Sequence, residues 1–158
     1  MYRHILLAYD GTEEGRLALR EGALLAKVSG AKVTLLAVVD PGYGLGLGVD
    51  PIGTYFPTDQ TASFEKVLEE GVQRLTRMGL PHVARLERGQ PAERIAAIAR
   101  DSQADLVVVG HRRQGVVAGW LLGSVTADLT NSLTCSLLVG RMDIADEELF
   151  GTAAAPAA

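Results

Sequence analysis

Residues 105–141 constrain the fold most, because they contain a strand, a loop, a helix and a second strand in succession. Residues 106–109 form a short apolar run rich in β-branched side chains, which is typical of a strand buried on both faces. Gly110 ends this run, and a basic loop with further glycines follows it. Gly123 and Ser124 then begin a predicted helix, and Ser136–Gly140 is the next strand. This order predicts an α/β domain.

The rest of the chain repeats the same alternation. Further apolar runs predict strands at residues 4–9, 32–39 and 82–86, and the strand before the loop covers residues 105–110. Helices are predicted after Thr12, at residues 61–78, from Pro91, and at residues 124–133. The chain shows neither an internal repeat nor a linker that would divide it. The sequence therefore predicts a single α/β sandwich around a parallel sheet.

Local signals mark the ends and the inward faces of these helices. Thr12 is a suitable N-cap, Gly30 a suitable C-terminal stop, and Pro91 is suited to a first helical position. Helical spacing predicts an inward face for each of the first three helices. These faces are Leu17, Leu24, Leu25 and Val28; Phe64, Val67, Leu68, Val72 and Leu75; and Ile95, Ile98 and Ala99.

The start of the helix at Ser124 suits a phosphate. A helix N-terminus has free backbone N–H groups and a partial positive charge, and a preceding glycine leaves room for an anion. Ser124 could add its hydroxyl to such a site, or it could serve as an ordinary N-cap. The sequence leaves both roles open.

The spacing of these glycines resembles the motif of ATP-binding universal stress proteins. That motif is Gly, two residues, Gly, nine residues, and then Gly-Ser or Gly-Thr. Gly110 and Gly123-Ser124 match it, whereas Arg113 replaces the second glycine. The turn at residues 8–12 (Ala-Tyr-Asp-Gly-Thr) and the segment 89–95 also resemble the family, so that the resemblance covers about residues 2–141.

The resemblance implies the rest of the architecture. It implies a three-layer sandwich with a five-stranded parallel sheet in the order 3-2-1-4-5, the adenine nucleotide alpha hydrolase-like fold. The family domain would cover residues 1–141. Residues 142–158 would form a loose tail, with local docking of Ile144, Leu149 and Phe150 as the alternative. Family members usually form homodimers, and here strand 136–140 would be the shared edge.

The resemblance also implies an adenosine site. In open α/β sheets, ligands bind where the strand order reverses, which here brings the turns after the first and fourth strands together. Ala8, Tyr9 and Asp10 would lie at the adenosine end, and Val38 would pack against adenine. Asp10 would accept a hydrogen bond from a ribose hydroxyl or help to hold Mg²⁺; its alternative role is to cap the next helix.

The phosphates would lie between the fourth strand and the fourth helix. By resemblance, Val109 and Gly110 would lie under the nucleotide, and the N–H groups of Gly123, Ser124 and Val125 would bind phosphate. The sequence leaves three roles open for Arg113. It could block the loop, it could bind phosphate oxygens together with Arg112 and His111, or it could point into solvent.

Composition excludes some functions. The net charge of −4 argues against general binding of nucleic acids or anionic membranes. The chain lacks a signal peptide and an apolar stretch that could span a membrane, and its single cysteine fits a reducing compartment, so we expect a cytoplasmic protein. The three histidines form no metal-ligand pattern with Cys135.

These observations favour a stress-response or signalling protein that binds ATP, AMP or cyclic AMP. The alternatives are a dimeric interaction module that does not bind ATP and a slow ATP hydrolase. We do not expect an enzyme, because the sequence has neither a P-loop lysine motif nor a convincing catalytic triad. The glycine-rich loop 42–48 could contact the ligand, but it lacks the spacing of a dinucleotide fingerprint.

Overall fold

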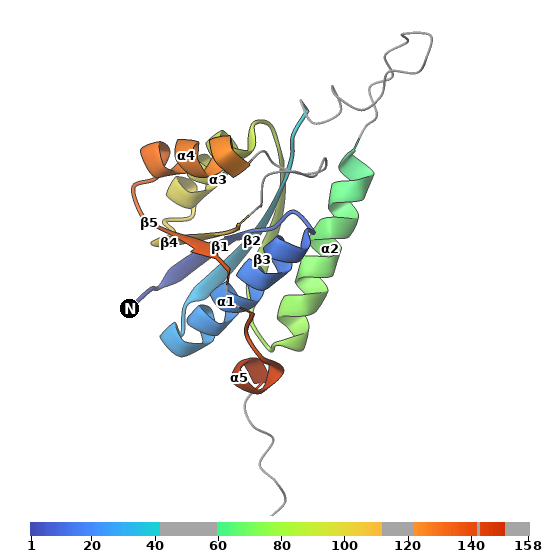
Figure 1. The fold of residues 1–158 in the computed structure, drawn as a ribbon, viewed down its shortest axis with the longest axis vertical. Coiled ribbons are helices and arrows are strands. Elements are labelled where there is room, and N and C mark those ends of the chain that lie inside the picture. The colour runs from blue at the N-terminus through green and yellow to red at the C-terminus, as the bar shows by residue number, and fades with distance from the viewer. Residues whose placement is uncertain (42–59, 112–121, 142, 151–158) are drawn as a thin grey trace, which may run out of the picture.

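A five-stranded parallel sheet forms the centre of the structure, with helices on both faces (Figure 1). The computed structural model describes residues 1–41, 60–111, 122–141 and 143–150, without the side chains of residues 122–124. The predictions for Arg112, Arg113 and the loop 42–48 therefore lie outside the described residues. The strands are β1 (His4–Ala8), β2 (Lys32–Val39), β3 (His82–Arg88), β4 (Leu106–Gly110) and β5 (Ser136–Gly140). Their order, β3-β2-β1-β4-β5, confirms the predicted topology.

Each face of the sheet has its own apolar core, because successive strand residues point to opposite sides. Ile5 and Leu7 of β1 belong to the core under α1 (Glu13–Ser29) and α2 (Thr61–Arg77). Leu6 and Ala8 belong to the core under α3 (Pro91–Asp101) and α4 (Leu122–Ser132). The two cores establish the predicted three-layer sandwich.

The predicted helix signals are largely confirmed. The Thr12 hydroxyl accepts a hydrogen bond from the Gly15 N–H, Gly30 ends α1 with a φ of 63°, and Pro91 begins α3. Two boundaries differ from the prediction by two residues, and the others by at most one. Strand β3 continues two residues further, to Arg88, and α4 begins at Leu122, so Ser124 lies inside the first helical turn and is not its N-cap.

The predicted inward face of α1 is wrong at Val28, which is 69% exposed. The buried positions of this helix are Leu19 and five small residues, Gly15, Ala18, Gly22, Ala23 and Ala26. A Cβ on Gly22 would lie only 2.4 Å from a methyl group of Leu7. The small residues allow α1 to pack closely on the sheet, and the larger apolar side chains lie to either side of that contact.

The segment after β5 is not a loose tail over its described part. It forms the short helix α5 (Asp146–Phe150) beside α1. Ile144 and Leu149 are 3% and 1% exposed, whereas Phe150 is half-exposed. The docking alternative is therefore confirmed for Ile144 and Leu149 and not for Phe150.

Asp105 joins the starts of the two central strands. Its carboxylate accepts hydrogen bonds from the backbone N–H groups of Arg3 and His4, at 2.9 and 3.0 Å. Partial burial opposes ionisation, but the two N–H donors outweigh it and lower the pKa of Asp105. The carboxylate thus fixes the register in which β1 enters the sheet beside β4.

We expect Asp105→Ala to lower the free energy of unfolding by roughly 1–2 kcal/mol, because two backbone donors lose their acceptor. Since folding lowers this pKa, the contribution of Asp105 is complete above the ordinary carboxyl pKa of 3.8 and is lost as the pH falls through the folded-state value. Urea unfolding at pH 7 and pH 3 measures both effects. The exposed Asp101 provides the control, since Asp101→Ala should change stability little. Equal stability of wild type and Asp105→Ala at pH 7 would contradict this account.

Candidate functional site

The site predicted from sequence lies where the strand order reverses. β1 pairs with β2 on one side and with β4 on the other, so the connections after β1 and β4 leave toward opposite faces of the sheet. Parallel sheets bind ligands at the carboxyl ends of their strands at such a point. The described structure therefore has its switch point between the carboxyl ends of β1 and β4, which is where a ligand crevice is expected.

Four of the predicted site residues lie in one apolar core, on the α3 and α4 face of the sheet. Ala8, Val38, Val109 and Val125 belong to the same apolar cluster, although they come from β1, β2, β4 and α4. All four are at most 7% exposed. The fold thus assembles an apolar floor from positions up to 117 residues apart in the chain, between Ala8 and Val125.

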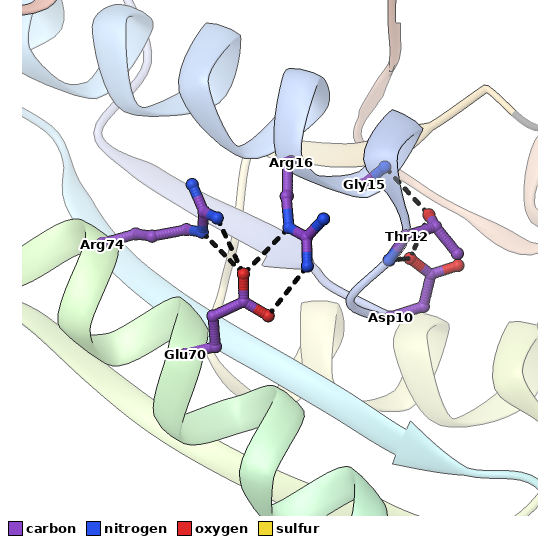
Figure 2. A network of polar contacts seen from close by, with 6 residues as sticks. All are labelled: Asp10, Thr12, Gly15, Arg16, Glu70 and Arg74. Carbon is purple, nitrogen blue, oxygen red and sulfur yellow. Dashed lines mark hydrogen bonds and ion pairs between the residues drawn. The ribbon is translucent and has the colours of Figure 1, made fainter.

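Asp10 lies two residues after the end of β1 and holds Thr12, the residue that caps α1. Its Oδ1 atom accepts hydrogen bonds from the Thr12 N–H at 3.0 Å and from the Thr12 hydroxyl at 2.6 Å. The Thr12 hydroxyl in turn accepts from the Gly15 N–H at 3.0 Å (Figure 2). A Cβ on Gly15 would lie 2.5 Å from Oδ1, so only glycine permits this arrangement. Asp10 thus supports the N-cap residue Thr12 through Oδ1 and does not itself cap α1.

The second oxygen of the same carboxylate is left for another partner. Within the part of the chain that the structure describes, we find no hydrogen bond to Oδ2 of Asp10. The carboxylate is half-buried and held in place by Thr12, at the carboxyl end of β1. It can therefore offer a fixed acceptor to a hydroxyl donor such as a sugar.

Tyr9 points to the opposite face of the sheet. Its ring is fully buried in the core under α1 and α2, and its hydroxyl has no hydrogen-bond partner among the described residues. Burial, followed by the negative charge of Glu70, raises the pKa of Tyr9. Only the backbone of Tyr9 can thus belong to the crevice, and its N–H already donates to the Leu36 carbonyl.

A charged network beside Tyr9 joins α1 to α2. Glu70 of α2 accepts from Arg16 of α1 at 2.9 Å and from Arg74 of α2 at 2.8 Å (Figure 2). The hydrogen bonds from Arg16, supported by those from Arg74, lower the pKa of Glu70 against the effect of its partial burial. Sequence reasoning missed this network: Glu70 and Arg74 have the i, i+4 spacing of a helical ion pair, whereas the pairing of Glu70 with Arg16 joins two helices and has no local spacing signal.

Gly110 permits the close approach of another backbone, which within the described residues is that of helix α1, and its predicted place under the nucleotide stays a prediction. A Cβ on Gly110 would lie 2.8 Å from backbone atoms of Glu14 and Gly15. Gly140, at the end of β5, meets the backbone of Ala18 in the same way, at 2.6 Å. Both glycines are therefore explained by the packing of α1 on the sheet, and sequence reasoning overlooked the second.

Gly123 and Ser124 lie in the first turn of α4, and Val125 follows them with its side chain buried in the apolar floor. The first N–H groups of any α-helix lack partners within the helix. The N–H groups of Gly123 and Ser124 therefore have no acceptor within the helix, and their predicted contact with phosphate stays a prediction.

A separate cavity of about 370 Å³ lies on the α1 side of the same sheet edge. It is lined by Glu13, Glu14, Leu17, His111, Gly140 and Arg141. His111 and Arg141 are in contact, at 3.3 Å between Nδ1 and Nη2. The described residues contain no group of three or more acidic, histidine or cysteine side chains that could hold a metal ion. None of the described helices is long and apolar enough to cross a membrane.

The profile of the Universal stress protein family matches residues 1–141. The chain belongs to this family. A Staphylococcus haemolyticus protein named as a universal stress protein is 30% identical over 158 residues, which cover 98% of this chain and 94% of the relative. Among solved structures, a universal stress family protein from Burkholderia pseudomallei has 28% identity and a TM-score of 0.66, with coverage of 87% of this chain and 95% of that one.

Two more distant structures of the family were solved with a nucleotide. A universal stress protein in complex with cAMP has 22% identity and a TM-score of 0.66, with coverage of 90% of this chain and 99% of that one. An Archaeoglobus fulgidus universal stress protein in complex with dAMP has 18% identity and a TM-score of 0.64, with coverage of 89% and 98%. At these identities, the likeness to this chain establishes the fold.

Proposed function

We propose that this universal stress protein binds an adenine nucleotide in the crevice between β1 and β4 and acts as a stress-response or signalling module. The apolar floor formed by Ala8, Val38, Val109 and Val125 carries the proposal, because the chain runs from Ala8 of this floor to the carboxylate of Asp10, which Thr12 holds in place, within two residues. An apolar surface with a few oriented polar groups is typical of a small-molecule site. The family members in complex with cAMP and dAMP support the same ligand class.

In this proposal, the base packs on the apolar floor and a ribose hydroxyl donates to Oδ2 of Asp10. The phosphates lie at the first turn of α4, where the N–H groups of Gly123 and Ser124 and the helix dipole favour negative charge. Mg²⁺ could accompany ATP, with Asp10 as the protein group nearest to it. The proposed role is binding, with a change of partner or shape as its output, in the cytoplasm.

Calorimetric titration with ATP, AMP and cyclic AMP tests this function. We expect saturable binding of at least one of the three, with guanosine monophosphate as the control for the base. Absence of heat for all three at millimolar ligand would instead favour an interaction module of the same fold. The packing of Gly110 against α1 favours that second candidate, because it explains this glycine without a ligand.

We expect Gly123→Val to abolish nucleotide binding and to leave the fold intact, because a branched side chain in the first turn of α4 would fill the approach of the phosphates. The matched control is Ser132→Val at the other end of the same helix, which should bind as wild type does. Titration with the nucleotide that binds best, together with circular dichroism, measures both properties. Unchanged affinity of Gly123→Val would place the phosphates elsewhere.

We also expect a homodimer that pairs through β5. This strand forms one edge of the sheet, and its residues Leu137, Leu138 and Val139 are only partly buried in the single chain. An edge of this apolarity is normally covered by a partner. Sedimentation at micromolar concentration should give twice the 16.7 kDa mass of one chain. A species of 16.7 kDa under these conditions would rule the dimer out.

A further inference from the structure

The segment after β5 binds to α1 as a separate small unit. It includes α5, and it follows directly on the family match, which ends at residue 141. Figure 1 shows α5 outside the sheet, next to α1. Its two apolar anchors, Ile144 and Leu149, are almost fully buried in the core that α1 and α2 share. The contact therefore adds apolar surface to a domain whose sheet and layers are already complete.

Two basic side chains of α1 hold the two ends of this segment. Arg20 donates to the carbonyl oxygen of Ile144 from Nε at 3.1 Å and from Nη2 at 2.6 Å, and it pairs with Asp146 at 2.5 Å. Lys27 donates to the carbonyl oxygen of Leu149, and its ammonium group lies 5.9 Å from the centre of the Phe150 ring. Arg20 and Lys27 are seven residues apart, which places them on the same side of α1, two turns from each other.

The acidic composition of the segment complements these cations. Asp143, Asp146, Glu147 and Glu148 give it four carboxylates, and three of them stand in the first turn of α5, where the helix dipole favours negative charge. We call the surface of α1 from Arg20 to Lys27, with the apolar residues between them, the docking surface. It fits a short acidic helix that has two apolar side chains on one face.

The contact between this segment and α1 has the features of one that opens while the rest of the domain stays folded. A helix of five residues is not stable in isolation, so α5 depends on its contact with α1. Only two of its side chains are deeply buried, whereas eight residues must be ordered, and the Asp146 side chain is 74% exposed. Elements with few buried contacts open locally while the core stays folded.

We propose that the α1 surface from Arg20 to Lys27 is a docking site for a short acidic amphipathic helix, and that residues 143–150 of this chain are its resident and displaceable occupant. When the segment detaches, the site accepts a helix of the same chemistry from another chain. The proposal concerns a surface on the opposite side of the sheet from the apolar floor of the crevice and is independent of nucleotide binding.

A fluorescent peptide with the sequence of residues 143–150 tests the proposal on the full-length chain. In the variant Leu149→Asp, the segment loses one of its two anchors and the docking surface is open. We expect the peptide to bind this variant at least tenfold more tightly than it binds wild type, where the surface is occupied. A control peptide with aspartate in place of Ile144 and Leu149 should bind neither chain.

Equal or absent peptide binding by wild type and a folded Leu149→Asp chain would overturn the proposal. If Leu149→Asp does not fold, Asp146→Ala replaces it, because that variant keeps both apolar anchors and the whole docking surface and loses the ion pair between the segment and Arg20. Hydrogen exchange of wild type provides a second readout. The amides of α5 should exchange by local opening, faster than those of β1; exchange of both at the same rate would also overturn it.

Discussion

Replacing Gly110 with alanine is expected to destabilise the protein by about 1–3 kcal/mol, as overpacking of a tight interior does. The added Cβ would lie 2.8 Å from the carbonyl carbon of Glu14 and from the N atom of Gly15. Because both are backbone atoms, rotation of a side chain cannot relieve the contact. The first turn of α1 must shift away from the end of β4, and Asp10 and Thr12 shift with it, since they are bonded to that turn.

Chemical unfolding of Gly110→Ala and Gly71→Ala measures this effect with a matched control. Gly71 is also buried, but a Cβ there meets only side-chain atoms of Leu35 and Tyr9, and alanine favours the helix that contains it. We expect a smaller loss for Gly71→Ala than for Gly110→Ala. A Gly110→Ala protein as stable as wild type would show that α1 does not pack on β4 as closely as described.

Replacing Asp10 with alanine is expected to weaken nucleotide binding by roughly tenfold to a hundredfold, because a hydrogen bond to a charged group contributes about 1.5–3 kcal/mol. The loss should be the same for adenosine and for AMP, since the carboxylate faces the sugar in the proposed arrangement. Titration calorimetry with both ligands measures the two losses. A larger loss for AMP than for adenosine would assign Asp10 to the phosphate end.

Asp10→Ala also has a structural effect that must be separated from binding. The Thr12 N–H and hydroxyl lose their shared acceptor, which should cost about 1 kcal/mol. The variant Thr12→Ser retains both donors and should resemble wild type in stability and affinity. If Asp10→Ala binds adenosine as wild type does, the Oδ2 atom of Asp10 has no part in the site.

The sequence predicted the fold well where the signal is local. Buried strands, the cap at Thr12 and the stop at Gly30 depend on residues close in the chain, and all appear where expected. The face of α1 could not be predicted from apolar spacing, because the sheet contacts its glycines and alanines and leaves Val28 in solvent. Docking of Ile144 and Leu149 depends on contacts with α1, which lies more than a hundred residues earlier in the chain. No local sequence pattern predicts such contacts.

The candidate site, too, could be predicted only in part. The strand order implied by the family resemblance was enough to bring Ala8, Val38 and Val109 together, because topology alone fixes their positions. The direction of Tyr9 followed from strand alternation but was not used, although Ala8 and Tyr9 must point to opposite faces. The role of Gly110 could not be foreseen, because the backbone of α1 lies against it only in the folded structure.

Amide chemical shifts during a titration with AMP test the central claim most directly, since they report where the ligand binds. Two pairs of residues distinguish the proposed nucleotide site from the cavity beside α1. Val38 and Val125 belong to the apolar floor of the crevice, and Leu17 and Arg141 line the cavity beside α1. We predict saturable shifts of Val38 and Val125 with little change at Leu17 and Arg141. Shifts confined to Leu17 and Arg141, or no shifts at millimolar AMP, would contradict the proposed site.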